Sequence, residues 1–183
     1  EFHKRQARRD PMSEAELIAS FETAWSNEGF VSREHEEARL EAGRAALRRF
    51  HASQSVPGAV VPAYVERDFS FRLDGDTIRG RWDRVDVEPA GAEEEAAVAV
   101  DVSGTSADVV SPTLPLLPRE RVEIIDYKSS DVRDPAKARQ RARESLQLSI
   151  YAMGYEALTG RLPDAVGLYF LDTGLVGKAE VDA

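Results

Sequence analysis

The sequence predicts an α/β protein: a three-layer α/β/α sandwich with a central mixed sheet and a helical segment in front of it. Apolar residues recur at helical spacing in the first third of the chain, alternate with polar residues in the middle, and then form two apolar runs around a long helical stretch. With 183 residues, 42% of them hydrophobic, the chain can form one domain with a sizeable core. We expect residues 1–59 to be a helical segment that packs on a core formed by residues 60–183.

Two helices are predicted in the first segment. Ser13 and Glu16 form a capping-box pattern, and the apolar residues that follow share one helical face until the break at residues 27–29. Ser32 begins a second helix, which residues 55–58 end. We expect the apolar stripes of both helices to be ordinary packing surfaces.

The middle of the chain predicts an antiparallel hairpin. Residues 64–73 alternate between polar and apolar side chains, Asp74 and Gly75 are typical of a two-residue turn, and residues 77–87 continue in extended form.

Residues 88–121 are predicted to be a mobile insertion. They contain an acidic run and closely spaced prolines, which neither a helix nor a strand tolerates throughout. Residues 96–102 could form a short strand and the prolines could present a polyproline ligand, although an extended hairpin loop is the simpler interpretation.

The last part predicts a strand, a helix and a second strand. Residues 121–128 are rich in β-branched side chains, and Asp134 followed by Pro135 begins a helix that runs to about Thr159. Residues 164–172 form the second strand. Because such crossovers are right-handed and join parallel strands, we expect the two strands to be parallel neighbours.

Composition excludes several classes of protein. No run approaches the roughly 18 apolar residues of a membrane span, and the first residues lack a signal-peptide core, so we expect a cytoplasmic protein without membrane contact. The net charge of -9 argues against a broadly basic nucleic-acid binder, and the absence of cysteine excludes thiolate zinc sites and cysteine-held iron–sulfur clusters. Residues 174–178 lack the spacing of a phosphate loop, so any helicase motor would lie outside this chain.

An acid and a lysine interrupt the strand over residues 121–128. Asp126 and Lys128 are two residues apart and therefore point to the same face, with Cα atoms about 6.5 Å apart. In the preceding strand, Asp83 and Asp86 are three residues apart and point to opposite faces, so one of these two acids can share a site with Asp126. Two neighbouring carboxylates repel unless a cation lies between them, and oxygen ligands favour Mg²⁺ or Mn²⁺. Lys128 could then orient or deprotonate a water molecule.

The competing interpretation of the Asp126–Lys128 pair is a salt bridge at the end of the sheet. Gln147 and Tyr151 favour a polar site, because they lie four residues apart on one face of the helix that follows the strand. A basic cluster in this region is either a solvated helix face or a guide for phosphate: Arg133, Lys137, Arg139, Arg141 and Arg143.

Three motifs resemble the RecB-type branch of the PD-(D/E)xK nuclease superfamily. They are GRWDRVD at 80–86, IIDYKSS at 124–130 and QLSIYA at 147–152, and with flanking elements the resemblance covers residues 60–172. It implies a restriction-endonuclease-like core with the following site residues: Asp83, Asp126 and the Tyr127 backbone carbonyl as metal ligands, Lys128 as the catalytic lysine, and Gln147 and Tyr151 as supporting residues.

The resemblance also implies an activity. Such domains hydrolyse DNA phosphodiester bonds with Mg²⁺ or Mn²⁺, often as parts of DNA repair helicase–nucleases related to UvrD or AddAB. We therefore expect single-stranded DNA as substrate and a helicase motor in the same polypeptide or complex. The alternative is an inactive nuclease-fold module for DNA binding or subunit interaction, but the intact set of Asp83, Asp126 and Lys128 favours a nuclease.

The chain departs from this family in its histidines. The family has a histidine in a GxxxH helix ahead of these motifs, whereas His3, His35 and His51 lack that setting and are expected at the surface. The first residues resemble the stretch just after that helix, so we expect this chain alone to be a poor nuclease that gains activity when extended upstream. Because cysteine is absent, the iron–sulfur subgroup of the family is excluded.

Overall fold

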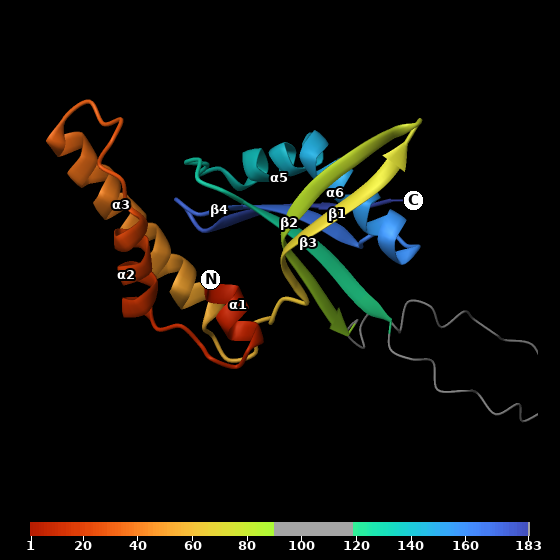
Figure 1. The fold of residues 1–183 in the computed structure, drawn as a ribbon, viewed down its shortest axis with the longest axis horizontal. Coiled ribbons are helices and arrows are strands. Elements are labelled where there is room, and N and C mark those ends of the chain that lie inside the picture. The colour runs from red at the N-terminus through yellow and green to blue at the C-terminus, as the bar shows by residue number, and fades with distance from the viewer. Residues whose placement is uncertain (90–118, 183) are drawn as a thin grey trace, which may run out of the picture.

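The computed structural model describes residues 1–89 and 119–182 (Figure 1). The helices in these ranges are α1 (Phe2–Ala7), α2 (Glu14–Ala24), α3 (Arg33–Gln54), α5 (Pro135–Arg143) and α6 (Leu146–Thr159). The strands are β1 (Tyr64–Leu73), β2 (Asp76–Pro89), β3 (Glu120–Lys128), β4 (Ala165–Phe170) and β5 (Leu175–Glu180).

The strands form one mixed sheet in the order β1-β2-β3-β4-β5. Neighbours are antiparallel except β3 and β4, which are parallel, as the predicted crossover requires. The hairpin turn between β1 and β2 has positive φ angles of 50° at Asp74 and 93° at Gly75, which is the conformation that two-residue hairpins favour. This turn pairs Leu73 with Asp76 and so determines the register of the whole hairpin.

Helices cover both faces of the sheet, which confirms the predicted three-layer arrangement. On one face, α5 and α6 enclose the larger core, in which Trp82, Ile124 and Phe170 are almost fully buried. On the other face, Phe2 of α1 and Phe50 of α3 pack against Ile125 and Tyr169. Figure 1 shows β1 and β2 curving away from the rest of the sheet and over α6.

A glycine allows α5 to approach the edge strand β5 closely. A Cβ atom on Gly177 would lie 2.0 Å from the backbone oxygen of Ala138 in α5. Ala138 and Ala142 are the buried residues of α5, so small side chains line both sides of this contact. The charged residues of α5 therefore face solvent.

The helices α2 and α3 form an arm that extends away from the sheet (Figure 1). Their predicted N-caps are confirmed: Ser13 makes the full capping box with Glu16, and Ser32 accepts a hydrogen bond from the His35 backbone. α2 has no buried residue and contacts α3, where the ring of Phe21 lies over Gly43.

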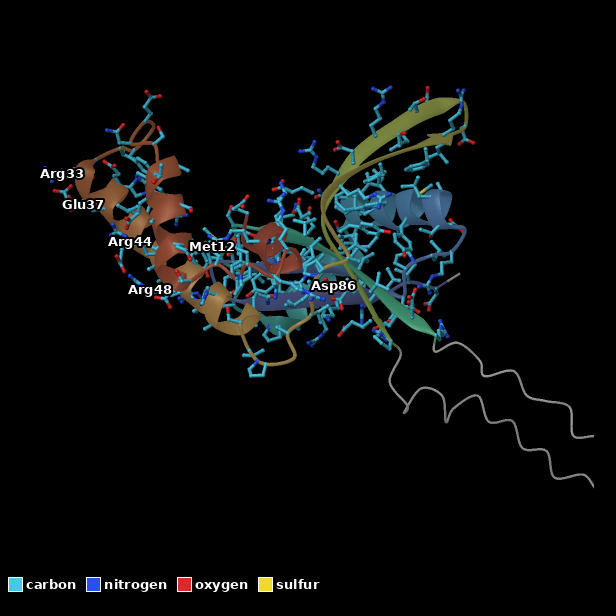
Figure 2. The ribbon with its side chains drawn as sticks, turned by 60° about the horizontal axis from the view of Figure 1, so that its bottom comes forward. Met12, Arg33, Glu37, Arg44, Arg48 and Asp86 are labelled. Atoms are coloured by element: carbon cyan, nitrogen blue, oxygen red, sulfur yellow. The ribbon has the colours of Figure 1, made fainter. Side chains whose placement is uncertain are left out.

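Ion pairs also tie the two helices of the arm together. Figure 2 shows Arg44 and Arg48 along α3, and Arg44 lies 2.7 Å from Glu22 of α2. Such exposed pairs contribute little each, so the arm depends on its aromatic contacts as well.

The structure corrects three predictions about elements. The helix expected from Pro135 to Thr159 is divided, because Ser145 caps a new helix by accepting a hydrogen bond from the Leu148 backbone. β5 was not predicted, and it contains residues 175–178 of the stretch that lacks the spacing of a phosphate loop. β2 and β3 extend into the predicted insertion, to Pro89 and from Glu120.

The strand at 96–102 and the polyproline segment lie outside the described residues. In the part of the chain that the structure describes, every helix is too short or too polar to traverse a lipid bilayer.

Candidate active site

Asp83 and Asp126 lie beside each other on neighbouring strands. β2 and β3 pair Arg84 with Ile125, so the next position along the ladder brings Asp83 opposite Asp126. The backbone N–H of Tyr127 donates a 2.9 Å hydrogen bond to Asp83 Oδ2. Asp86 points to the other face, where it pairs with Arg84. Of the two acids that the strand periodicity left open, the structure therefore brings Asp83 to Asp126, and Asp83 is the acid that the family resemblance implied.

An interruption of the β1–β2 ladder determines where Asp83 points. Regular pairing fails at Glu66 and Asp83, and Glu66 has a φ of 49°, which is unusual for a residue with a side chain. As a result, Trp82 and Asp83 both face α6 although they are consecutive: Trp82 donates a 3.2 Å hydrogen bond to the Tyr151 carbonyl. A regular strand would have sent one of them to the opposite face.

Lys128 and Gln147 complete a connected group of polar side chains. Lys128 Nζ lies 2.7 Å from Asp126 Oδ2 and donates a 2.7 Å hydrogen bond to Gln147 Oε1. The amide nitrogen of Gln147 donates to Asp126 Oδ1 at 2.9 Å and to the Tyr151 hydroxyl at 2.8 Å. Gln147 is exposed, whereas Tyr151 is buried. The first turn of α6 therefore lies beside the end of β3.

The electrostatics of the two carboxylates favour a bound cation. Burial raises the pKa of Asp83, and the charge of Asp126 raises it further, while the Tyr127 N–H and Lys128 oppose the shift. Asp126 is 3% exposed, and its Oδ2 accepts no well-oriented hydrogen bond from the described residues although Lys128 lies close. A divalent cation beside these oxygens would relieve both the repulsion and the missing interaction.

The donor set fits a hard divalent ion that keeps part of its hydration shell. In residues 1–89 and 119–182, no three His, Asp or Glu side chains are arranged to hold a metal ion. Asp83 and Asp126 supply two carboxylates, and the Tyr127 carbonyl is a possible third ligand. Mg²⁺ is commonly bound by one or two carboxylates with water at its other positions, so the residues fit the expected ion.

The predicted DNA-binding residues lie outside this group. All five are exposed on or just before α5: Arg133, Lys137, Arg139, Arg141 and Arg143. Arg133 pairs with Asp131 at 3.0 Å, and Arg141 contacts Ser130 at 3.5 Å. Because Ser130 follows Lys128 by two residues, this contact places Arg141 near the end of β3 that carries Lys128.

The structure corrects the expectation that all three histidines lie at the surface. His3 was predicted at the surface but is only 6% exposed, and it lies on the face opposite Asp126, where its Nε2 is 2.7 Å from the Tyr127 hydroxyl. His51 is half-buried, with Nε2 3.0 Å from the Met12 carbonyl. His35 is exposed, as predicted.

Glu66 is an acid near the site that the sequence reasoning missed. It lies opposite Asp83 in the hairpin register, its charge raises the pKa of Asp83, and it forms an ion pair with Lys4 of α1. Counting back from the two-residue turn, which pairs Leu73 with Asp76, could have found it.

The chain matches the sequence model of a known protein family. The model describes the PD-(D/E)XK nuclease superfamily and matches residues 1–112, which is more than half of the 183 residues. The matched part contains Asp83 and ends before Asp126 and Lys128. A search of curated proteins found no match.

Proposed function

The chain belongs to the PD-(D/E)XK nuclease superfamily, and on that premise we propose that it is a metal-dependent nuclease domain that hydrolyses DNA phosphodiester bonds. One observation carries the proposal. Two carboxylates from neighbouring strands, Asp83 and Asp126, lie beside Lys128, whose ammonium group is held by Asp126 and Gln147. A salt bridge alone would need neither Asp83 nor the amide of Gln147.

Asp83, Asp126 and the Tyr127 carbonyl would hold the metal ion. When bound, Mg²⁺ or Mn²⁺ supplies positive charge that polarises the phosphate and makes water more acidic. The residues of the chain do the rest by orientation: the Tyr127 N–H holds Asp83 through Oδ2, and Gln147 holds Asp126 through Oδ1.

Lys128 would orient the attacking water. An ammonium group has three N–H donors, and here one of them donates to Gln147 Oε1 while the ammonium charge lies 2.7 Å from Asp126 Oδ2. A remaining N–H can hold a water molecule or a phosphate oxygen in front of the carboxylates. Burial raises the pKa of Tyr151, so its hydroxyl stays protonated. Its weak 3.4 Å hydrogen bond to Asp126 Oδ1 therefore brings no additional negative charge to the site.

The finer parts of the proposal concern the biological setting. We propose single-stranded DNA as substrate, a RecB-type relationship, and a parent DNA repair or recombination protein with a helicase motor. The three sequence motifs support the RecB-type relationship and its setting, and the exposed basic residues of α5 support DNA as the substrate.

An inactive nuclease-fold module is the second candidate. The observation that favours it is the small donor set, because no three acidic or histidine side chains converge in the ranges described above. Measuring metal binding and DNA cleavage on the same protein separates the two candidates.

The test uses Asp126→Asn, which preserves shape but removes the charge. Its expected effects are loss of Mn²⁺- or Mg²⁺-dependent degradation of single-stranded DNA by the protein, and loss of Mn²⁺ binding measured by calorimetry. The matched control is Asp131→Asn, an exposed aspartate that pairs with Arg133. Retained cleavage in Asp126→Asn would refute the nuclease proposal, and metal binding without cleavage in the wild type would favour the inactive module.

A further inference from the structure

A buried polar network lies on the far face of the sheet, directly behind the candidate site. Its centre is the ion pair of Arg84 and Asp86, whose residues are 5% and 6% exposed and whose Nε–Oδ1 distance is 2.8 Å. Arg84 Nη1 also lies 2.5 Å from Gln54 Oε1 of α3 and 3.3 Å from His3 Nε2 of α1. Figure 2 shows Asp86 on β2, within the body of the molecule.

The network also holds the side chain of Tyr127. The Tyr127 hydroxyl lies 2.7 Å from His3 Nε2 and 3.4 Å from Arg84 Nη1. His3 Nδ1 is 3.0 Å from Gln6 Oε1, which accepts, so the proton of a neutral imidazole is on Nδ1 and Nε2 accepts from its neighbours. Each of these groups is satisfied by a specific partner.

The members of this network alternate along the chain with the members of the site. Arg84 directly follows Asp83 in β2, and Tyr127 lies between Asp126 and Lys128 in β3. In addition, the backbone N–H of Tyr127 holds Asp83 at 2.9 Å, and its carbonyl is the proposed third ligand. A shift of Arg84 or Tyr127 on the far face would therefore move the carboxylates on the near face.

We propose that Arg84 is a positioning residue for the nuclease site: with Asp86, it holds β2 and the Tyr127 side chain of β3 from behind, so that Asp83 and Asp126 meet in the geometry a metal ion requires. This inference rests on the proposed function. Stability alone does not explain the network, because replacing a buried ion pair by apolar residues of similar size is often neutral or stabilising. Outer partners that orient metal ligands, in contrast, typically change affinity 10- to 100-fold, on the order of what we expect here.

The main variant is the double substitution Arg84→Met/Asp86→Leu. It removes both buried charges together and fills the space with apolar atoms, so neither charge is left unpaired. The matched control is Arg81→Met/Asp68→Leu, which removes an ion pair between β1 and β2 whose side chains are 59% and 72% exposed. Tyr127→Phe tests the hydroxyl alone, and Arg84→Lys tests whether a positive charge without the guanidinium fork is sufficient.

Three measurements report directly on the geometry and metal affinity of the candidate site. Hydrogen exchange of the Tyr127 amide, measured without metal, should become roughly tenfold faster in the double variant, because that amide is bound to Asp83. The Mn²⁺ dissociation constant from calorimetry should rise by about tenfold or more. In cleavage assays, the Mn²⁺ concentration for half-maximal cleavage should rise while the cleavage rate at saturating Mn²⁺ largely recovers.

The control variant should match the wild type in all three readouts. Arg84→Lys should differ from the wild type in the same direction as the double variant. Wild-type amide exchange and Mn²⁺ affinity in a folded Arg84→Met/Asp86→Leu protein would overturn the proposal. If that protein does not fold, the same readouts are taken on Tyr127→Phe and Arg84→Lys. Wild-type amide exchange and Mn²⁺ affinity in both of these variants would then overturn the proposal. Failure of the proposed function is distinguishable, because the wild type would then bind Mn²⁺ without cleaving DNA, or Asp126→Asn would leave Mn²⁺ binding unchanged, whereas failure of the positioning role leaves wild-type cleavage and the effect of Asp126→Asn intact.

Discussion

The burial of His3 predicts a specific dependence of stability on pH. Burial lowers the pKa of His3 from 6.5 to about 4, and the nearby Arg84 lowers it further, while the hydrogen bond to Gln6 opposes the shift. Its neighbours from the other elements are Tyr127 of β3 and Phe50 of α3, and Phe2 packs against it from its own helix. Protonation would place an N–H of His3 against Arg84, which cannot accept a hydrogen bond.

The sign and size of the effect follow from proton linkage. Between about pH 6.5 and about pH 4, the unfolded chain binds a proton at this histidine and the folded chain does not, so the free energy of unfolding falls as pH falls. Above that window the contribution to stability is fully present. The total loss is about 3 kcal/mol, and about 2 kcal/mol of it lies between pH 7 and pH 5.

The assay is urea unfolding at pH 7 and pH 5, comparing the wild type with His3→Gln. The comparison isolates His3, because other groups contribute equally to both proteins; one of these is Asp83, whose raised pKa acts in the opposite direction. We expect His3→Gln to lose about 2 kcal/mol less than the wild type on acidification. His35→Gln, at an exposed histidine, should behave as the wild type.

Parallel behaviour of the wild type and His3→Gln between these two pH values would refute the reasoning. It would mean that His3 titrates normally in the folded protein and that the far-face network tolerates a charged imidazole beside Arg84.

Three further predictions test the site, the DNA-binding surface and the packing of the edge strand. Lys128→Met should lower the single-turnover cleavage rate by roughly 10²-fold or more. Its Mn²⁺ affinity should be unchanged or higher, because the substitution removes a cation beside Asp126. A loss of Mn²⁺ affinity would contradict the role assigned to Lys128. Arg139→Gln/Arg143→Gln should weaken the binding of single-stranded DNA to an Asp126→Asn protein, and should reduce the slope of log K against log salt concentration by about 0.7 per lost phosphate contact. Arg33→Gln on the arm is the control and should change neither the affinity nor the slope. Equal slopes in all variants would exclude α5 from the DNA interface. Gly177→Ala should lower the free energy of unfolding, measured with urea, by about 1–3 kcal/mol, because the new Cβ would lie 2.0 Å from the Ala138 carbonyl oxygen. Val176→Ala on the same strand should lower it by less. Equal losses of unfolding free energy would argue against the close contact of α5 with β5.

The locally encoded parts of the fold could be predicted from the sequence. The capping box at Ser13, the hairpin turn at Asp74 and the parallel crossover from β3 to β4 all appear in the structure. So does the placement of Asp126 and Lys128 on one face. The cap, the turn and the shared face depend on residues close together in the chain, because periodicity, turn conformation and capping are local properties. The parallel crossover could be predicted because a helix between two strands nearly always joins them in this way.

Predictions that depend on contacts between distant segments were incomplete or wrong. The helix break at Ser145 was missed, because Gly and Pro are absent there and the cap alone is a weak signal. His3 was assigned to the surface, since nothing near it in the chain shows that α1 packs against Phe50 and Tyr127.

The sequence by itself determined which chemical groups are available: two acids, a lysine and an amide on adjoining strands and a helix. Only the tertiary structure decided which of Asp83 and Asp86 joins Asp126, because that choice depends on the β2–β3 register and on the interrupted ladder at Glu66. The same registers place Arg84 and Tyr127 on the far face, where helices from the start of the chain complete a network around them. Side-chain types are read from the chain directly, whereas the pairing of strands is settled by long-range packing that no short stretch of sequence contains.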